Sequence, residues 1–286
     1  MGLQIATNVG ALNAYRNLSA NQNDVSKSLE KLSSGLRINR AADDAAGLAI
    51  SEGLRAQVNG LNVAARNAQD GISVIQTAEG ALTEVHSILQ RVRDLAVQAG
   101  NDSNNVDSRA AITTEVTQLV DELERIADST NFNGINLLDA SAGAAGDGTL
   151  SFQVGANGDA SSQITVDLST ADIKTLATDL RTAIVTTDGF ADPTVAAATI
   201  TTVDASIKSV SSARADLGAI QNRFESTINS LQVSAENLAA AKSRIADTDM
   251  AAEMVKYTAS NILQQAGTAM LAQANQSGQG VLQLLR

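Results

Sequence analysis

The stretch LRAQVNGLNVAARNAQDGISVIQTAEGALTEVHSILQRVRDLAVQA, residues 54–99, carries apolar side chains at alternating spacings of four and three residues. This alternation is the period of one face of an α-helix. The stripe consists of Leu54, Val58, Leu61, Ala65, Ala68, Ile72, Ile75, Ala78, Leu82, Val85, Leu89, Val92, Ala96 and Ala99. It predicts a single helix of about 46 residues, about 69 Å long at 1.5 Å per residue.

Two further segments continue this pattern. Residues 203–245 keep the same near-heptad register and predict a second long helix, and residues 111–128 predict a shorter amphipathic one. Helices much longer than the usual 11 to 12 residues, with a seven-residue apolar repeat, indicate coiled-coil-like packing. The fold class expected is therefore mainly α, a long antiparallel helical rod built as a coiled-coil-like bundle.

The two ends of the chain carry apolar stripes but little charge. The first charged side chain is Arg16, and residues 257–285 contain no Asp, Glu, Lys or Arg. A single amphipathic helix is marginal in water, so each terminal helix needs a partner for its apolar face. We expect the two termini to pair, with Asp249 as the N-cap of the C-terminal helix. A pair of helices leaves apolar surface exposed unless other copies cover it.

The middle of the chain has the only strand pattern. LSFQV, residues 150–154, and ITVDL, residues 164–168, alternate apolar and polar residues around a loop that contains Asn157-Gly158. A two-residue Asn-Gly turn would place the two apolar triplets on opposite faces. We therefore expect a bulge or a longer loop that pairs Val154 near Ile164. Residues 141–148 are expected to form a flexible linker, and DGFADPT, residues 188–194, a turn.

Composition excludes several functions. The 286 residues include no Cys, so disulfides and thiolate metal sites are absent. The net charge of −11 lies in residues 101–200, which hold 4 basic and 15 acidic side chains, and this balance argues against a nucleic-acid partner. Neither end contains an apolar run that would span a membrane, and the first ten residues lack the pattern of a cleaved secretory signal.

Candidate catalytic and metal-binding residues are few. The single histidine, His86, lies within the long helical pattern and is expected at a helix surface or groove. The acidic pairs Asp43-Asp44 and Asp247/Asp249 lack EF-hand spacing and lie where helices should begin, which favours turn and capping roles. The Gly-rich segments lack the P-loop pattern. We expect neither enzymatic activity nor a cofactor.

Four segments resemble the bacterial flagellins. They are LSSGLRINRAADDAAGLAISEGLRAQ at 32–57, NAQDGISVIQTAEGAL at 67–82, NFNGINLL at 131–138 and SRIADTDMAAEMVKYTASNILQQAGTAMLAQANQ at 243–276. The resemblance implies a structural subunit that polymerises into the flagellar filament for swimming motility. It also implies that residues 1–44 and 247–286 form a discontinuous inner helical domain, and that residues 45–246 form the rod, with a hairpin region at about 140–200. One departure is Gly278, where flagellins often have proline.

The same resemblance implies partners and a location. The expected partners are other copies of the chain in a helical filament, the flagellar export apparatus, a flagellin export chaperone, and the hook-junction and filament cap proteins. The expected location is extracellular, after secretion, in the flagellum. QRVRDLAVQ at 90–98 is similar to the segment bound by the flagellin-sensing Toll-like receptor, and the matching residues are Arg91, Leu95 and Glu115.

The surface expected to pack against other subunits combines both termini, because uncharged apolar helices avoid buried unpaired charges. Its members are Ile5, Val9, Leu12, Leu263, Met270, Leu282 and Leu285. Two other readings remain: the flagellin-like junction protein between hook and filament, and a cytoplasmic coiled-coil scaffold. The junction protein shares the terminal patterns, whereas a scaffold gives no reason for neutral ends.

Overall fold

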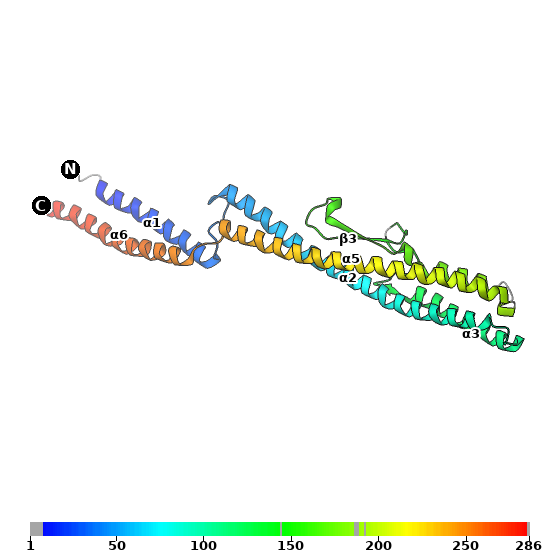
Figure 1. Cartoon of the computed structure of the whole chain (residues 1–286). Helices are drawn as coiled ribbons and strands as arrows, with labels where there is room; N and C mark the ends of the chain where they lie inside the picture. Colours follow the sequence, from blue (N-terminus) through cyan, green and yellow to red (C-terminus); the bar gives the residue numbers. More distant parts are fainter. Residues whose placement is uncertain (1–7, 144, 186–188, 192, 285–286) are drawn as a thin grey trace. The chain divides into compact units, whose positions relative to one another are not determined.

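The computed structural model describes residues 8–143, 145–185, 189–191 and 193–284, and they form a mainly helical chain (Figure 1). Six α-helices account for most of it: α1 Val9–Ser34, α2 Ala45–Ala99, α3 Val106–Ser129, α4 Ile173–Val185, α5 Pro193–Ala246 and α6 Met250–Leu284. Short 3-10 turns lie at Ala160–Ser162, Ser169–Ala171 and Gly189–Ala191. The mainly α fold predicted from the apolar periodicity is confirmed.

The two longest helices exceed their predicted lengths. α2 has 55 residues, because Asp44 starts the helix by accepting a hydrogen bond from the backbone N–H of Gly47 at 2.8 Å. α5 has 54 residues and begins at Pro193, a residue that fits the first turn of a helix because it has no N–H to satisfy. The apolar stripe therefore located both helices but not their first turns.

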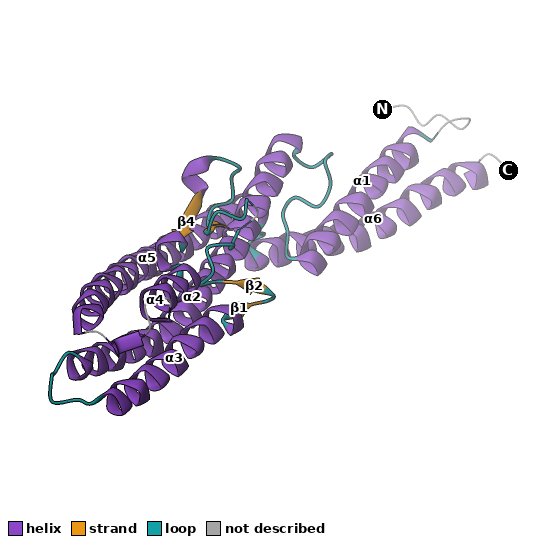
Figure 2. Ribbon diagram, turned by 90° about the vertical axis from the view of Figure 1, so that its right-hand side faces the viewer, coloured by secondary structure: helices purple, strands orange, loops and turns teal. Residues whose placement is uncertain are grey.

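Two small antiparallel hairpins complete the secondary structure (Figure 2). In the first, β1 Asn131–Phe132 pairs with β2 Ile135–Asn136 through a turn at Asn133-Gly134, whose φ angles are 52° and 81°. Positive φ at both central residues is what the tight hairpin turn requires, and Asn-Gly supplies it. The Asn-Gly sequence thus makes a tight turn at 133–134, a hairpin that the sequence analysis missed.

In the second hairpin, β3 Thr149–Gln153 pairs with β4 Gln163–Asp167. The longer loop predicted here is confirmed, but the predicted register is wrong by two residues. Ile164 pairs with Phe152, and Val154 instead donates its N–H to the carbonyl of Ser162 at 2.8 Å. This register places the apolar residues of both strands on one face, which a one-residue shift would have reversed.

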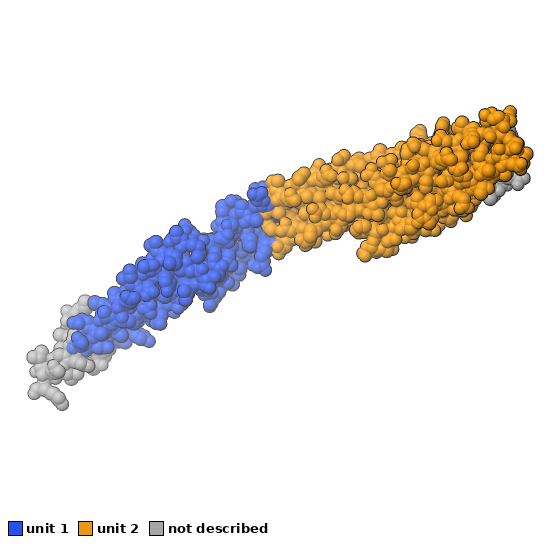
Figure 3. All heavy atoms as spheres, turned by 90° about the horizontal axis from the view of Figure 1, so that it is seen from below, with its two compact units in different colours: residues 1–57, 236–286 blue, residues 58–235 orange. Residues whose placement is uncertain are grey.

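The chain divides into two compact units, residues 1–57 with 236–286 and residues 58–235 (Figure 3). The predicted boundaries at 44/45 and 246/247 coincide with the connections between helices, whereas the units separate within α2 and α5. Residues 58–235, the second unit, contain one continuous apolar core. It is built from α2, α3, α4, α5 and the larger hairpin, and Leu82, Leu89, Leu123, Phe190 and Phe224 are fully buried in it.

α4 was not predicted, although it closes one side of this core. Ile173, Leu180 and Ile184 are buried, while Lys174 and Arg181 bind acidic residues of α3. Arg181 contacts Asp121 at 2.5 Å and Glu124 at 2.7 Å. These pairs orient α4 on α3 and account for part of the acidic charge of the central region.

Candidate self-assembly surface

The first unit contains the pair formed by the two terminal helices, α1 and α6. They run antiparallel, because Asn8 Nδ2 donates to the carbonyl of Ala274 at 3.0 Å near one end and Ser28 Oγ donates to Glu253 Oε1 at 2.5 Å near the other. The pairing of the termini predicted from their apolar stripes is therefore observed, and Figure 1 shows the two helices side by side.

Each helix presents one heptad-spaced stripe of partly or fully buried residues to the other. On α1 these residues are Ala11, Ala14, Leu18, Asn21, Val25, Ser28 and Leu32. On α6 they are Glu253, Tyr257, Ser260, Gln264, Gly267, Leu271 and Ala274. Leu18 lies close to Gly267, where an added Cβ would be 3.3 Å from Leu18 Cδ1. The spacing is that of a coiled coil, but small and polar residues occupy many of its core positions.

This interface is shallow. Within residues 9–34 and 250–276 of the two helices, the side chains that reach full burial are those of two serines, Ser28 at 1% exposed and Ser260 at 8%. The apolar members of both stripes remain partly exposed. The pair therefore has little core of its own. Because burial of apolar surface is the main source of helix-pair stability, this interface contributes little stability.

Most of the large apolar side chains of α1 and α6 point away from this interface. The four predicted packing residues whose side chains are described, Val9, Leu12, Leu263 and Met270, are between 54% and 65% exposed. Ile5 and Leu285 lie outside the described residues, as does the side chain of Leu282. Their packing role stays a prediction.

α6 carries apolar residues around most of its circumference. Ala252, Ala259, Leu263, Ala266 and Met270 form a second heptad-spaced stripe that Lys256 interrupts, all of it exposed, and we call its apolar members the outer α6 stripe. Val255 and Ile262, which the predicted packing set omitted, are 72% and 60% exposed on a further side of the helix. A helix that is apolar on several sides is typical of a buried position.

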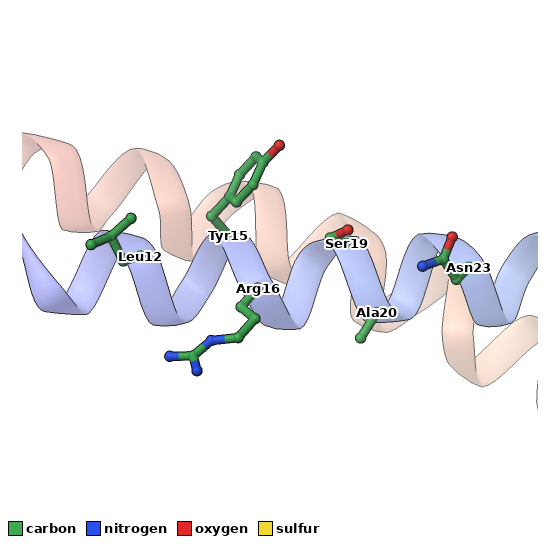
Figure 4. Close-up of a pocket in the computed structure, with 6 residues that line it drawn as sticks. All are labelled: Leu12, Tyr15, Arg16, Ser19, Ala20 and Asn23. Atoms are coloured by element: carbon green, nitrogen blue, oxygen red, sulfur yellow. The ribbon is translucent and has the colours of Figure 1, made fainter.

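The outer face of α1 has a shallow groove (Figure 4) with a volume of about 620 Å³. Its lining residues all come from α1: Leu12, Tyr15, Arg16, Ser19, Ala20 and Asn23. Tyr15, which is 63% exposed, was missed as a surface residue because the sequence analysis followed only aliphatic periodicity. Arg16 is the one charged residue of this lining and donates a hydrogen bond to Asn13.

The connection between α1 and α2 is tied to the connection between α5 and α6. The Arg37 side chain donates two hydrogen bonds to the carbonyl of Ile245, at 2.6 and 3.2 Å, and its backbone N–H donates to Ala246 at 2.7 Å. Thr248 returns a backbone hydrogen bond to Gly35 at 3.0 Å. These contacts satisfy carbonyls at the end of α5 and set the start of α6 beside the end of α1.

Asp43, Asp44 and Asp249 have the turn and capping roles predicted for them, and the role of the Asp247 side chain stays a prediction. Asp249 accepts hydrogen bonds from the backbone of Ala251 at 2.9 Å and Ala252 at 3.1 Å. Asp43 accepts from the backbone N–H groups of Arg40 and Asn39, and these hydrogen bonds lower the pKa of its carboxyl group. Oriented N–H donors stabilise the ionised form.

The predicted receptor residues lie in the second unit. Arg91 on α2 and Glu115 on α3 form an exposed ion pair, with Arg91 Nη2 2.6 Å from Glu115 Oε1. Leu95 is only 2% exposed and belongs to the core. The structure therefore brings two of the three residues together at the surface, and Leu95 supports the helix from inside.

Other chemistry is sparse in the described part of the chain. His86 is half-buried on α2, with its Nε2 3.0 Å from Gln90 Nε2. Within the described residues there is no cluster of three or more His, Cys, Asp or Glu side chains suited to a metal ion. None of the described helices combines the length and the apolar character that crossing a membrane requires.

Comparisons with known proteins agree with this arrangement. The model of the bacterial flagellin N-terminal helical region matches residues 5–143, and that of the C-terminal helical region matches residues 200–285. Flagellin of Halalkalibacterium halodurans is 54% identical over 279 residues, 98% of each chain, and flagellin of Bacillus subtilis is 50% identical over 304 aligned residues, 99% of this chain and 100% of the relative. The flagellar filament 33 kDa core protein of Treponema phagedenis is 48% identical over 98% of each chain. The chain belongs to the bacterial flagellin family.

Proposed function

We propose that this protein is the structural subunit that polymerises into a bacterial flagellar filament outside the cell and so supports swimming. The observation that carries the proposal is the state of α1 and α6, which pair with each other but leave Val9, Leu12, Leu263 and Met270 exposed. Members of the flagellin family are structural proteins, and one relative is named as a filament core protein.

The exposed apolar side chains of α1 and α6 favour assembly with other copies. Several large apolar side chains are exposed together on these two helices, and exposed apolar patches mark interaction surfaces. The faces of α1 and α6 that remain uncovered differ from each other, so a face of one copy can bind an unlike face of the next. Contacts between unlike surfaces generate open helical assemblies when they do not close into a ring. The uncharged segment 257–285 would avoid burying unpaired charges in such a contact.

The test is polymerisation of purified protein, seen by negative-stain electron microscopy after seeding or salting out. Full-length protein should form long filaments, and protein truncated after Lys256 should not. Leu263→Asp places a charge on the outer α6 stripe and should abolish polymerisation. The matched control is Val106→Asp, which adds the same charge at a residue that is 78% exposed at the start of α3. Filaments of normal length from Leu263→Asp would contradict the proposal.

The remaining partners follow from the proposed role. A filament subunit needs the flagellar export apparatus and an export chaperone before assembly, and it meets the hook-junction and cap proteins at the ends of the filament. The junction protein itself is the alternative role for this chain. Discrete particles from full-length protein, in place of filaments, would favour that alternative.

Recognition by a host Toll-like receptor is a separate proposal for the second unit. The Arg91–Glu115 pair supports it as an exposed, charged feature that two helices hold in place. The paired groups are 56% and 45% exposed, so a partner has access to both.

A further inference from the structure

We propose that the methionines of α6 form an oxidation site that controls assembly, in which a peroxide converts the thioethers of Met250, Met254 and Met270 to sulfoxides and blocks polymerisation without unfolding the second unit. This inference rests on the proposed filament function and adds a chemical control to the same surface.

The distribution of sulfur in the chain is the first observation. The sequence has four methionines and no cysteine, and apart from Met1 every methionine lies on α6. No thiol therefore competes for an oxidant. The core of the second unit contains no methionine, so sulfur oxidation does not alter its packing.

Exposure is the second observation. Met250 is 47% exposed, Met254 is 49% and Met270 is 65%. Susceptibility of methionine to oxidation follows access to the sulfur, and these side chains are open to a small oxidant in the unassembled subunit. Met270 belongs to the outer α6 stripe, whereas Met250 and Met254 lie one helical turn apart on another side of the helix.

The chemistry balances with a hydroperoxide as the oxidant. A sulfur lone pair attacks one peroxide oxygen, the O–O bond breaks, and the departing oxygen leaves as water after proton transfer when the oxidant is hydrogen peroxide. The sulfur loses two electrons and the peroxide gains them. The product is a polar sulfoxide, which methionine sulfoxide reductases return to the thioether with electrons from a thiol.

The consequence for assembly follows from the position of Met270. A contact that buries this side chain gains apolar area from the thioether, but it must desolvate a strong hydrogen-bond acceptor once the sulfur is oxidised. On the N-terminal side of Met270, the outer α6 stripe offers Leu263 and Ala266, which donate no hydrogen bond to a sulfoxide, whereas Gln273 on the other side is exposed and carries an amide donor. We expect the critical concentration for polymerisation to rise about tenfold or more.

The position of Met270 also predicts that assembly protects its sulfur atom from oxidation. If a neighbouring copy covers the outer α6 stripe, peroxide should oxidise Met270 more slowly in filaments than in subunits. Oxidation would therefore affect newly exported subunits and leave subunits already in a filament unchanged.

The experiment treats the full-length subunit with dilute hydrogen peroxide and locates the sulfoxides by peptide mass spectrometry. Polymerisation is then measured by sedimentation and electron microscopy, and folding of the rod by circular dichroism. We expect sulfoxide at all three positions, loss of polymerisation and an unchanged melting temperature of the second unit. Treatment with methionine sulfoxide reductase and dithiothreitol should restore polymerisation.

The matched variant replaces the three methionines of α6 by leucine, M250L/M254L/M270L, which keeps the apolar surface but removes the three sulfur atoms of α6. It should polymerise before and after peroxide treatment. Loss of polymerisation in the treated variant would overturn the inference, because the damage would then lie elsewhere, and so would normal polymerisation of fully oxidised wild-type protein. Failure of the untreated wild-type protein to form filaments would instead contradict the proposed filament function, on which the inference depends.

Discussion

The ring of Phe224 on α5 meets the ring of Phe152 on β3 edge to face, with centroids 5.7 Å apart and planes at 86°. Gly71 of α2 lies against the same ring, and a Cβ there would be 2.8 Å from Phe224 Cζ. Phe224 is fully buried, so one glycine on α2 makes room for the contact that joins the hairpin to the helices.

Gly71→Ala should therefore destabilise the rod although alanine favours helices. The added methyl group displaces Phe224 in a close-packed site, and such overpacking costs about 1 to 3 kcal/mol. Thermal unfolding followed by circular dichroism measures the effect. Gly80→Ala is the control, because an added Cβ there has nothing within 4 Å, and it should stabilise the same helix by up to about 1 kcal/mol. Equal melting temperatures for the two variants would contradict the packing argument.

Arg91→Ala should reduce signalling through a flagellin-sensing Toll-like receptor, because it removes half of an exposed ion pair. The matched control is Arg93→Ala on the same helix, where Arg93 Nε is 2.6 Å from Asp204 Oδ1 and the two side chains are 43% and 49% exposed. Exposed pairs contribute about 0 to 1 kcal/mol, so neither variant should unfold the rod. A reporter-cell assay gives the comparison. Equal signalling by the wild type and Arg91→Ala would argue against this contact.

Acid should weaken the segment that leads from β2 to β3, where Asp139 and Asp147 accept hydrogen bonds. Burial opposes ionisation of Asp139, but hydrogen bonds from Ser141 and Asn136 outweigh it and lower its pKa. At Asp147, hydrogen bonds from the Thr149 hydroxyl and N–H lower the pKa. A lowered folded-state pKa contributes stability above the unfolded value of 3.8, and this stability is lost as pH falls through the folded-state pKa.

The melting temperature should accordingly drop as the pH falls below 3.8, and the double variant Asp139→Asn/Asp147→Asn should show a smaller drop. The difference should be about a few degrees, because Asp147 is exposed and Asp139 is only partly buried, so solvent screens both groups. Melting curves of both proteins across this range measure it. If the double variant keeps the full acid dependence of the wild type, other groups are responsible.

The sequence predicted the long helices because their apolar residues repeat over many turns. From Ala68 to Ala99 the stripe is buried except for Ile72, whereas Leu54, Val58 and Leu61 are only partly buried. The apolar stripe does not reach the first turns of α2, because small alanines at 45, 46 and 49 give no periodic signal. The acidic pair Asp43-Asp44 indicated the start of the helix instead, and Asp44 caps it.

Shorter elements depended on features that periodicity does not report. α4 has the helical spacing Ile173, Ala177, Leu180 and Ile184 and an acceptor at Asp172 Oδ1 for the N–H of Thr175, so the signal was present but short. In the terminal pair, Leu29 follows Val25 and precedes Leu32 at helical spacing, yet it is 55% exposed. Which of several apolar faces meets the partner helix is decided by close packing such as Leu18 against Gly267, and spacing alone does not encode that choice.

The N-cap of α6 gives a last test that connects local structure to assembly. Asp249→Ala removes the acceptor for the N–H groups of Ala251 and Ala252, and loss of an N-cap costs about 1 kcal/mol. If α6 must be helical in the filament, this loss raises the critical concentration about fivefold, since 1.4 kcal/mol corresponds to a factor of ten.

Asp249→Ser should have a critical concentration close to that of the wild type, because serine also caps helices. Asp247→Ala removes the same charge two residues away and leaves the cap intact, so it separates capping from net charge. Sedimentation of polymerised protein over a concentration series measures all three variants. Similar increases in the critical concentration for Asp247→Ala and Asp249→Ala would mean that the loss of charge is responsible. An increase confined to Asp249→Ala would show that assembly depends on the helical start of α6.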